Sequence, residues 1–383
     1  MRKLKSSSYL MMLLLTGLPA LFAATLANAQ AYSYQTVAEG IAYPWRIAFL
    51  PDGRMLVTSR EGRLWLLSAG GQDKKEISGV PPVLAQGQGG LFEALPHPDF
   101  ATNGLVYLTY AHGTTDANAT RVARARLNGT ALENLEVLFT AEPLKAGPAH
   151  FGGRMIFLPD GTFLLTTGDG FNYREEAQKL DNHLGKIVRL NADGTVPQDN
   201  PFVKQADARP EIWSYGHRNP QGIAYDAATS RVYANEHGPA GGDEINIIQP
   251  GRNYGWPIAT RGRDYSGAMI SPFKSYAGME EPMVDWTPSI APSALEIYRG
   301  DMFQGWQGDL LTSALVSRDV RRVRVSGDQV AEQESLFADV GERLRDVRVG
   351  PDGAIYLATD TAAGRIIRVT PAKRQAAGGA PPR

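Results

Sequence analysis

One short pattern occurs six times along this chain, and it restricts the fold more than any other feature. In each copy an apolar run leads into a tight turn of the Pro-Asp-Gly type and resumes after it, which predicts two antiparallel strands. The copies are Ile47–Leu56, Ala94–Val106, Met155–Leu164, Ile223–Val232, Leu295–Leu311 and Val347–Ile355. The turns lie roughly 47 to 75 residues apart, a period typical of radial or solenoid repeats. We therefore expect equivalent residues of distant copies to gather around one axis.

The predicted fold is all-β: a six-bladed β-propeller of four-stranded antiparallel blades with a central axial site. Gly and Pro are spread along the chain, as many short strands joined by turns require, and no linker divides it. Helical periodicity is absent apart from one short candidate, Tyr173–Leu180. Seven or eight blades also fit the length, and a β-sandwich with unrelated hairpins is the alternative architecture.

Residues 1–29 have the features of a secretory signal peptide: a basic start, an apolar core at residues 10–24 and the small-x-small cleavage site ANA before Gln30. A retained membrane anchor is the alternative, but the apolar core is short for a bilayer span. We therefore expect a periplasmic protein without stable membrane insertion. Residues 30–370 would form one propeller domain, and residues 371–383 a flexible C-terminal tail.

The mature chain has nearly balanced charge and no cysteine. Loss of the three basic residues of the signal peptide takes the net charge from −1 to about −4, which offers nothing to a nucleic-acid partner. An exported chain without cysteine has no disulfides, but this one is long enough to bury a large core without them. We expect a monomer or weak dimer.

The repeat also predicts which residues occupy equivalent positions. Residues at the same distance before each turn enter the innermost strand of a blade. Such residues would lie at the same end of the central channel. At this position stand Gln88, His150, Arg218, Asn219, Arg343 and Arg345. A concave pocket with several convergent polar groups is the first candidate for a binding or active site. Taken singly, each residue could instead be structural: a buried histidine, a braced turn, or arginines on a blade edge.

Three arginines in one pocket indicate an anionic ligand, since guanidinium groups bind carboxylates bidentately. His150 could serve as a general base, because the pKa of histidine lies near neutral pH. A second cluster, Asn235–Asn246 followed by Pro250–Pro257, combines acidic residues with Gly and Pro, whose carbonyls are accessible. Such oxygen-rich turns suit Ca²⁺, although a loop rigidified by its own Asp and Asn hydrogen bonds has the same composition. Zinc is a poor alternative, because the cluster has a single histidine.

Several motifs follow one another in a characteristic order. They are GQGGLFEALPHPDF, HFGGRMIFLPDG with TTGDG, LGKIVRLNADG, GHRNPQGIAYD, NEHGPAGGDEINIIQPGRNYGWP, WTPSIAPS and RLRDVRVGPDG. Together they resemble the soluble quinoprotein glucose/sorbosone dehydrogenase family, and within it the periplasmic aldose sugar dehydrogenases. The resemblance covers residues 34–370. It implies a six-bladed propeller with pyrroloquinoline quinone (PQQ) and Ca²⁺ as cofactors.

The resemblance also implies roles for the catalytic residues. His150 matches the general base that takes the proton of the sugar C1 hydroxyl as hydride passes to the quinone. Arg218, with Asn219 beside it, matches the arginine that polarises the quinone C5 oxygen. Asp169 of the TTGDG motif matches an acidic residue that orients the histidine.

The same resemblance implies a cofactor shell and two calcium sites. The positions that line the cofactor or its water shell are matched by Gln88, Asp243, Arg343 and Arg345. The carbonyls of Gly238 and Pro239 match ligands of the catalytic Ca²⁺. Glu244 and the carbonyl of Tyr254 match a second, structural Ca²⁺ site.

Three positions depart from the pattern of the family. Ala149 stands where the glucose-specialised enzymes carry Asp, and Ser289 replaces a Thr. Val316 falls where many members place a Lys against the cofactor, a contact that Arg318 could replace. Because the Asp is missing, we expect a broad range of sugars rather than strict glucose selectivity.

The leading functional hypothesis is oxidation of aldose sugars at C1 to lactones, with electrons passed to an external acceptor. A Ca²⁺-dependent lactonase is an alternative, since propellers also host hydrolytic metal sites. It would need carboxylates around the axial metal, where the sequence places arginines. A non-catalytic propeller that binds a partner is the third possibility, and such a chain need not keep His150 and Arg218 in register.

Overall fold

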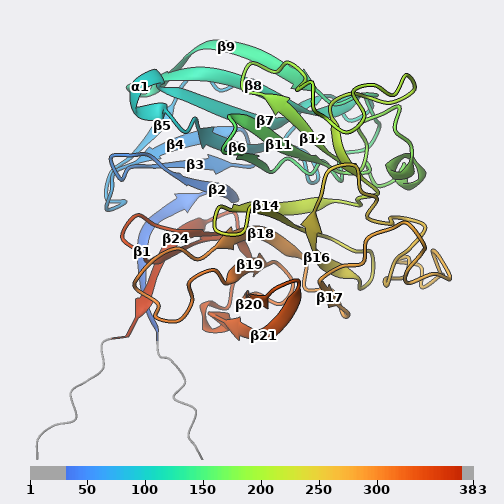
Figure 1. The fold of residues 1–383 in the computed structure, drawn as a ribbon. Coiled ribbons are helices and arrows are strands. Elements are labelled where there is room, and N and C mark those ends of the chain that lie inside the picture. Colours follow the sequence, from blue (N-terminus) through green and yellow to red (C-terminus); the bar gives the residue numbers. More distant parts are fainter. Residues whose placement is uncertain (1–31, 373–383) are drawn as a thin grey trace, which may run out of the picture. The chain divides into compact units, whose positions relative to one another are not determined.

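The structure, a computed structural model, describes residues 32–372, which contain 24 strands in six four-stranded sheets. The predicted signal peptide and most of the predicted C-terminal tail lie outside the described residues. Within each sheet the strands are antiparallel, and the sheets are arranged as the blades of a propeller (Figure 1). The predicted six-bladed β-propeller is therefore confirmed.

Five blades are built from strands that follow one another in the chain. Blade 1 consists of β2 (Pro44–Phe49), β3 (Met55–Ser59), β4 (Arg63–Leu67) and β5 (Lys74–Ile77). Blade 2 consists of β6 (Leu91–Pro96), β7 (Leu105–Gly113), β8 (Asn118–Asn128) and β9 (Ala131–Thr140). Blade 3 consists of β10 (Met155–Phe157), β11 (Thr162–Thr167), β12 (Lys186–Asn191) and β13 (Ile212–Tyr215).

The remaining blades complete the ring. Blade 4 consists of β14 (Pro220–Asp226), β15 (Arg231–Glu236), β16 (Asp243–Ile248) and β17 (Val284–Trp286). Blade 5 consists of β18 (Pro292–Ile297), β19 (Leu310–Ala314), β20 (Val320–Ser326) and β21 (Gln329–Leu336). Blade 6 consists of β22 (Leu344–Val349), β23 (Ile355–Thr359), β24 (Gly364–Pro371) and, at its outer edge, β1 (Tyr32–Ile41).

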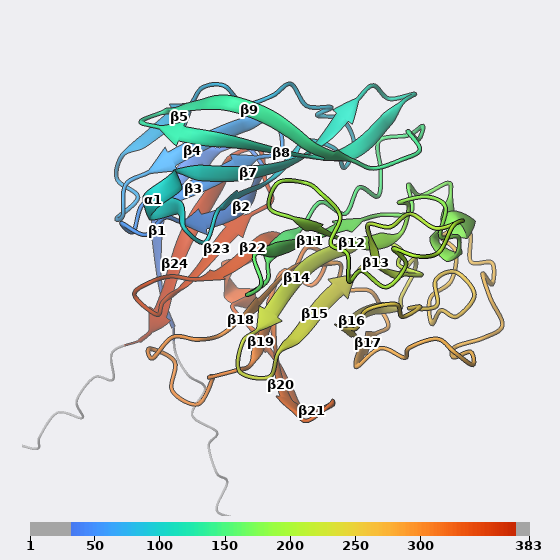
Figure 2. The same ribbon diagram turned by 45° about the horizontal axis from the view of Figure 1, so that its top comes forward.

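The two ends of the described chain close the ring, because β1 pairs with β24. The six innermost strands, β2, β6, β10, β14, β18 and β22, each contact the next one around the axis, and β22 contacts β2. The view of Figure 2 shows β14, β18 and β22 side by side. We call the end of the channel where these strands begin the upper end, and the end where they stop the lower end.

The six copies of the sequence pattern correspond to the six hairpins between the first two strands of each blade. In the third copy, Asp160 of the turn accepts hydrogen bonds from the backbone and hydroxyl of Thr162, and Gly161 has a φ of 82°. An Asp side chain bound two residues on, followed by a glycine with positive φ, is the chemistry of a tight turn. Apolar residues on both sides are buried between blades, as Tyr107 and Phe163 are between blades 2 and 3.

Helices are few in the described part of the chain: α1 (Phe100–Asn103) and the 3₁₀ turns η1 (Arg174–Gln178) and η2 (Ala338–Val340). The short candidate predicted at Tyr173–Leu180 is η1. None of the helices within residues 32–372 has the length and apolar character needed to cross a membrane. The long loops 168–185 and 249–283, green and gold at the right of Figure 1, lie at one side of the ring.

Arg154 lies at the axis and joins all six blades. It precedes β10 of blade 3, and its backbone N–H donates to Thr166 of β11. Its guanidinium contacts at least one residue from each other blade: Trp45, Glu93, Gln221, Ser293, Arg345 and Asp346. The residue is only 1% exposed. Arg154 therefore separates the upper end of the channel from the lower end.

Candidate active site

A buried histidine and aspartate form the centre of the upper end. His150 lies just before β10, and its Nδ1 is 2.6 Å from Oδ1 of Asp169, which follows β11. Both side chains are nearly inaccessible to solvent. No described residue forms a hydrogen bond with the other ring nitrogen, Nε2. Donation from Nδ1 to the carboxylate would leave Nε2 as a free proton acceptor.

The local sequence explains how this pair is held. Asp169 Oδ1 also accepts the backbone N–H of Phe171 at 2.8 Å, and its Oδ2 accepts Nε1–H of Trp256 at 2.8 Å. A side chain on Gly168 would place its Cβ 2.3 Å from the carbonyl oxygen of His150, so only glycine allows the two segments this close. His150 itself has a φ of 51°, in the left-handed region. The HFGG and TTGDG motifs thus fix the position of the pair.

The electrostatics of the pair keep the histidine neutral. Burial lowers the pKa of His150, and the positive charges of Arg218 and Lys145 act in the same direction, against the raising effect of Asp169. Burial would raise the pKa of Asp169, but its hydrogen bond to His150 and the nearby charges bring it below the usual range. A neutral imidazole beside an ionised carboxylate is suited to accept a proton.

Arg218, which precedes β14, is buried beside this pair. Its terminal nitrogen donates to the carbonyls of His237 at 3.0 Å and Gly238 at 2.7 Å. Its backbone N–H donates to Glu236, and its backbone carbonyl accepts the N–H of Asp169 at 2.8 Å. The guanidinium is therefore fixed relative to both the carboxylate of the pair and the loop after β15.

The neighbouring Asn219 also takes part in this arrangement. Its Oδ1 accepts the backbone N–H of Gly152 at 3.1 Å and the side-chain amide of Gln221 at 3.2 Å. Its Nδ2 is buried without a hydrogen-bond partner among the described residues. Gln88, on the other side, accepts the backbone N–H of His150 at 2.9 Å. The structure thus brings Gln88, His150, Arg218 and Asn219 together at the upper end.

A cavity of about 200 Å³ lies next to these residues at the axis. Its polar lining comes from Arg60, Gln88, Gln221, His237, Arg343 and Arg345. Arg343 and Arg345 share one carboxylate, Asp360, at 3.2 and 3.3 Å. Three lining arginines against one carboxylate leave two positive charges. Nε of Arg345 and Nε2 of His237 are buried without hydrogen-bond partners among the described residues. This cavity is therefore positive and has polar groups to offer an anion.

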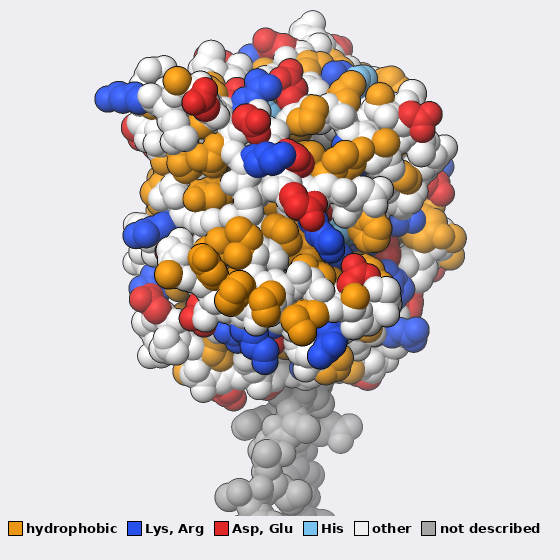
Figure 3. All heavy atoms as spheres, turned by 90° about the vertical axis from the view of Figure 1, so that its right-hand side faces the viewer, with side chains coloured by type: hydrophobic (Ala, Val, Ile, Leu, Met, Phe, Trp, Pro, Cys, Tyr) orange, Lys and Arg blue, Asp and Glu red, His pale blue; other side chains and the backbone are white. Residues whose placement is uncertain are grey.

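A second hollow, of about 290 Å³, lies on the other side of Arg218. Phe171, Trp256 and Tyr265 line it, together with the polar side chains of Asn172, Arg174, Glu175 and Asp264. Phe171 contacts the ring of His150 edge-on, with the ring centroids 5.0 Å apart. Figure 3 views the side of the molecule where the long loops lie, and hydrophobic side chains gather there among acidic and basic ones. This hollow offers a mixed aromatic and polar surface beside the histidine.

The predicted ligands of the catalytic calcium, Gly238 and Pro239, lie in the loop after β15, and Asp243 begins the next strand, β16. Asp243 accepts hydrogen bonds from the backbone of Gly238 at 2.8 Å and of Ala291 at 2.7 Å, and from the hydroxyl of Ser289. Both of its oxygens are engaged, so in this structure it holds the loop. The carbonyl of Gly238 faces the guanidinium of Arg218, and Pro239 lines the hollow beside it.

The proposed structural calcium site lies further from the axis. Glu244 on β16 is opposite Glu236 on β15 and Asp285 on β17. Burial, and then the charge of Glu236, raises the pKa of Glu244 well above its ordinary value. The side chain of Tyr254 is stacked on His217. Across residues 32–372, no three His, Cys, Asp or Glu side chains are grouped so that they could hold a metal ion, so any cation here would need backbone ligands.

The departures noted in the sequence can also be placed. Val316 lines the 200 Å³ cavity and is 59% exposed, so a longer side chain there would reach into it. Arg318 does not line the cavity, and its guanidinium contacts the carbonyl of Gly341 at 3.4 Å. In this structure Arg318 therefore does not replace the missing lysine. Ala149 is half-buried beside His150.

Sequence reasoning missed several residues of the site. The motifs given above contain Trp256, His237 and Gln221. The spacing rule did not select these residues, because they do not precede a turn by the required distance. Arg60 follows β3 rather than preceding an innermost strand. Lys145 is buried, donates to Asn118 Oδ1 at 2.8 Å, and has its pKa lowered to about 8 by burial. Nothing in the sequence marked this lysine.

The fold and the site together define the class of this protein: a six-bladed β-propeller with a buried histidine–aspartate pair beside an arginine-lined axial cavity. The family model for Glucose / Sorbosone dehydrogenase matches residues 41–368. The aldose sugar dehydrogenase YliI of Escherichia coli is 42% identical over 363 residues, which are 93% of this chain and 98% of that protein. This chain belongs to the glucose/sorbosone dehydrogenase family.

Solved structures agree with this assignment. The apo form of the soluble aldose sugar dehydrogenase from Escherichia coli superposes with a TM-score of 0.86 at 41% identity, covering 89% of this chain and 100% of that one. The PQQ-bound form of the aldose sugar dehydrogenase from Streptomyces coelicolor superposes with a TM-score of 0.71 at 28% identity, covering 89% and 98%.

Proposed function

We propose that this protein is a periplasmic, PQQ-dependent dehydrogenase that oxidises aldose sugars at C1 to lactones and passes the electrons to an external acceptor. The observation that carries the proposal is the His150–Asp169 pair, which contacts Gln88 of the positive axial cavity and Phe171 and Trp256 of the aromatic hollow. A sugar in the hollow and a cofactor in the cavity would meet at His150. Family membership and the PQQ-bound relative from Streptomyces coelicolor support the choice of cofactor.

The residues at the upper end fit a quinone that carries three carboxylates. Arg60, Arg343 and Arg345 line the cavity, and only Asp360 balances them. Nε of Arg345 and Nδ2 of Asn219 are buried donors without acceptors among residues 32–372, and a buried N–H group gains stability from an acceptor. We propose that these groups and Gln88 hold PQQ. When bound, PQQ would supply the two-electron acceptor for the hydride of the sugar.

Ca²⁺ prefers carboxylate and backbone oxygen ligands, and the loop after β15 offers backbone carbonyls, of which that of Gly238 accepts a hydrogen bond from Arg218. The carbonyls of Gly238 and Pro239 would hold the catalytic ion, and Asp243 fixes the loop that presents them. When bound, this Ca²⁺ would supply a Lewis acid. Glu244 and the carbonyl of Tyr254 would hold a structural ion, which would relieve the buried negative charge of Glu244 and Glu236.

The part of His150 in the reaction follows from its hydrogen bonds. Asp169 holds the proton on Nδ1, so Nε2 can take the proton of the C1 hydroxyl. The carboxylate then stabilises the imidazolium that forms. Trp256 and the backbone of Phe171 keep Asp169 in place. Arg218 places a fixed positive charge beside the pair, where negative charge develops on the acceptor.

The aromatic hollow suits a pyranose, because aromatic rings bury apolar sugar faces while polar groups at the rim bind hydroxyls. Ala149 presents no carboxylate next to His150, which supports a broad range of aldoses. The hollow has polar groups on several sides and no enclosed pocket for one hydroxyl pattern. Discrimination between sugars that differ at one hydroxyl should therefore be weak.

One experiment tests the proposal and its alternatives. The mature protein is titrated with PQQ, with and without Ca²⁺, and quinone binding is followed by fluorescence. Reduction of an artificial electron acceptor is then measured with several aldoses. Quinone binding without oxidation of any sugar would rule out the dehydrogenase. Lactone hydrolysis that needs Ca²⁺ but no quinone would favour a lactonase, and absence of both quinone binding and hydrolysis would favour a binding propeller.

A further inference from the structure

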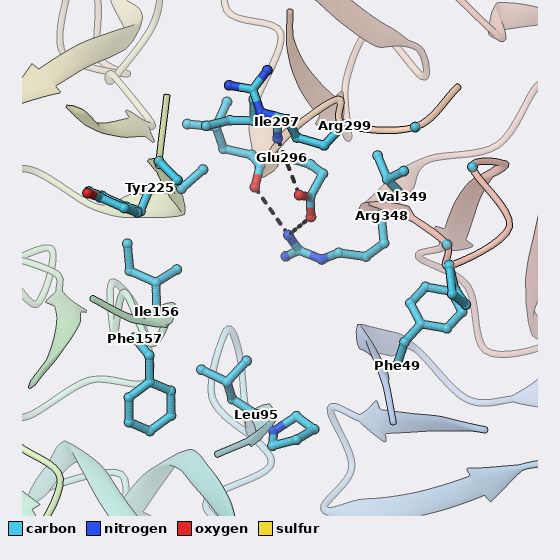
Figure 4. Close-up of a pocket in the computed structure, with 18 of the residues that line it drawn as sticks. Phe49, Leu95, Ile156, Phe157, Tyr225, Glu296, Ile297, Arg299, Arg348 and Val349 are labelled. Carbon is cyan, nitrogen blue, oxygen red and sulfur yellow. Dashed lines mark hydrogen bonds and ion pairs between the residues drawn. The ribbon is translucent and has the colours of Figure 1, made fainter. Parts of the chain in front are cut away.

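A larger cavity, of about 960 Å³, opens at the lower end of the channel. Each blade contributes one apolar side chain from the end of its innermost strand: Phe49, Leu95, Phe157, Tyr225, Ile297 and Val349. Figure 4 shows them around the charged side chains of Glu296 and Arg348. All but Ile297 remain partly exposed. An apolar wall with a few polar groups is the usual composition of a small-molecule site.

This lower cavity is separate from the candidate active site. The two share no lining residue. Between them lies Arg154, whose contacts with Glu93 and Asp346 fill the axis. A ligand in the lower cavity would therefore contact neither His150 nor the arginines of the upper end.

Most charged groups of the lower cavity are already paired. Arg348 contacts Glu296 at 2.8 Å and Asp346 at 2.9 Å, and it donates to the carbonyl of Leu295, as the dashed lines of Figure 4 show in part. Arg299 pairs with Asp226. On the acidic side, Asp352 pairs with Arg368 at 2.7 Å. These pairs offer little to a ligand.

Arg46 also forms an ion pair, but only one of its three guanidinium nitrogens takes part in it. Its side chain is 10% exposed, and its Nε lies 3.0 Å from Glu93. The hydrogen bonds formed by residues 32–372 include none donated by its two terminal nitrogens, and the residue lines the lower cavity. A nearly buried guanidinium whose two terminal nitrogens are free to donate matches the geometry of a carboxylate, which it can bind bidentately.

We propose that the lower cavity binds an organic monocarboxylate with an apolar body. Its carboxylate would lie on the terminal nitrogens of Arg46, and its body would contact the ring of Phe49, Leu95 and Val349. A sugar is a poor fit, because five of the six apolar side chains around the cavity carry no group that can hydrogen-bond to its hydroxyls. A phosphate is also a poor fit, because the single guanidinium of Arg46, already paired with Glu93 and beside the carboxylates of Glu296 and Asp301, does not balance a double charge.

The first test uses 1-naphthoate as the probe and isothermal titration calorimetry on the mature protein without added quinone. We expect one binding event per chain. The neutral analogue 1-naphthalenemethanol should bind about 10- to 100-fold more weakly, the usual value of a charged hydrogen-bonded pair. Acetate, which lacks the apolar body, should give no measurable binding. Equal affinity for the naphthoate and its neutral analogue would overturn the proposal.

Variants then locate the site. Arg46→Gln should weaken naphthoate binding about 10-fold or more. Leu95→Trp, which places a bulkier side chain where the apolar body would lie and removes no charge, should do the same. Thermal melts show whether each variant is folded. If only one of the two variants folds, that variant alone is enough for the test. Two controls, Arg54→Gln at an exposed ion pair and Arg343→Gln in the upper cavity, should leave the affinity unchanged. Loss of binding in Arg343→Gln, with full binding in the two lower-cavity variants, would refute the assignment.

Discussion

Replacement of Arg154 by methionine tests whether the six blades are joined at the axis. Methionine fills much of the volume and can still contact the ring of Trp45, but it donates no hydrogen bond. The carbonyls of Gln221 and Ser293 lose donors at 2.7 and 2.6 Å. Glu93 and Asp346 each lose one cation. Removal of one partner from a buried ion pair costs about 3 to 5 kcal/mol.

Two kinds of contact change the expected loss of unfolding free energy in Arg154→Met. Glu93 keeps Arg46 at 3.0 Å, and Asp346 keeps Arg348 at 2.9 Å, so neither carboxylate is left alone. This lowers the cost, whereas the lost carbonyl hydrogen bonds, each worth about 1 kcal/mol, raise it. We therefore expect Arg154→Met to lower the free energy of unfolding by about 3 to 5 kcal/mol. The measurement is urea denaturation followed by circular dichroism and tryptophan fluorescence, whose agreement tests two-state behaviour.

The matched control is Arg63→Met. Arg63 pairs with Glu76 at the surface, where both side chains are about half exposed. Such pairs contribute under about 1 kcal/mol. If Arg154→Met were no more destabilising than Arg63→Met, the axial role of Arg154 would be refuted.

The pH dependence of the loss gives an independent check on its cause. Burial raises the pKa of Asp346 from 3.8 to about 6, although Arg154 opposes the shift. A raised carboxyl pKa favours the folded state at low pH, and this advantage is lost as the pH rises through the folded-state value. Without Arg154 the pKa of Asp346 should rise further. The deficit of Arg154→Met relative to the native protein should therefore be larger at pH 8 than at pH 5, and an equal deficit at both would contradict the account.

Three further predictions concern the upper end. His150→Ala should retain quinone binding in a fluorescence titration but lower turnover about 10²- to 10⁴-fold, and unchanged turnover would remove His150 from the mechanism. Arg343→Gln should weaken quinone retention in the same titration, whereas Arg318→Gln should not; equal effects would show that the arginine cavity was misplaced. Because burial lowers the pKa of His150, the acidic limb of the kcat/KM profile should fall below pH 6.5, and a limb above that value would contradict a neutral buried base.

The number of blades was predictable from the sequence because each hairpin is determined by residues that are close together in the chain. A tight turn between two apolar runs needs only neighbouring residues, such as Asp160, Gly161 and Thr162 in the third copy. The ring follows from this count, since every innermost strand must contact the next one. Closure by β1 was not predictable in this way, because its partner β24 lies at the other end of the described chain.

The candidate site was predictable only where it follows the repeat. Gln88, His150, Arg218 and Arg343 each stand directly before an innermost strand, so a shared register was enough to place them at one end. Arg60 and Asp360 also reach that end, but from the far ends of the second strands β3 and β23. The spacing rule selected only residues at the start of the first strand of each blade, so it did not predict Arg60 and Asp360.

The site residues that come from the long loops have no fixed spacing from the repeated turns, so the repeat does not predict where they lie. Trp256 belongs to loop 249–283, yet its indole contacts Asp169 in blade 3. That loop begins at the end of β16 and returns to the edge of β17, so no spacing rule brings one of its residues to the upper end. The hydrogen bond to Asp169 depends on how the whole loop packs, which is a tertiary property.

The two ends of the channel differ because of where their residues stand on the innermost strands. Residues that precede a strand, such as His150 and Arg218, have irregular backbone and can point polar groups at a ligand. Residues that end a strand, such as Phe49 and Val349, belong to the regular sheet and to the apolar run of the hairpin pattern. The turn pattern thus makes the lower end apolar in every blade and leaves the upper end free to carry chemistry. Arg46 is a charged residue inside an innermost strand, as Glu296 and Arg348 are, and its Nε pairs with Glu93. Within residues 32–372 its two terminal nitrogens donate no hydrogen bond, and the proposed carboxylate would supply their acceptor.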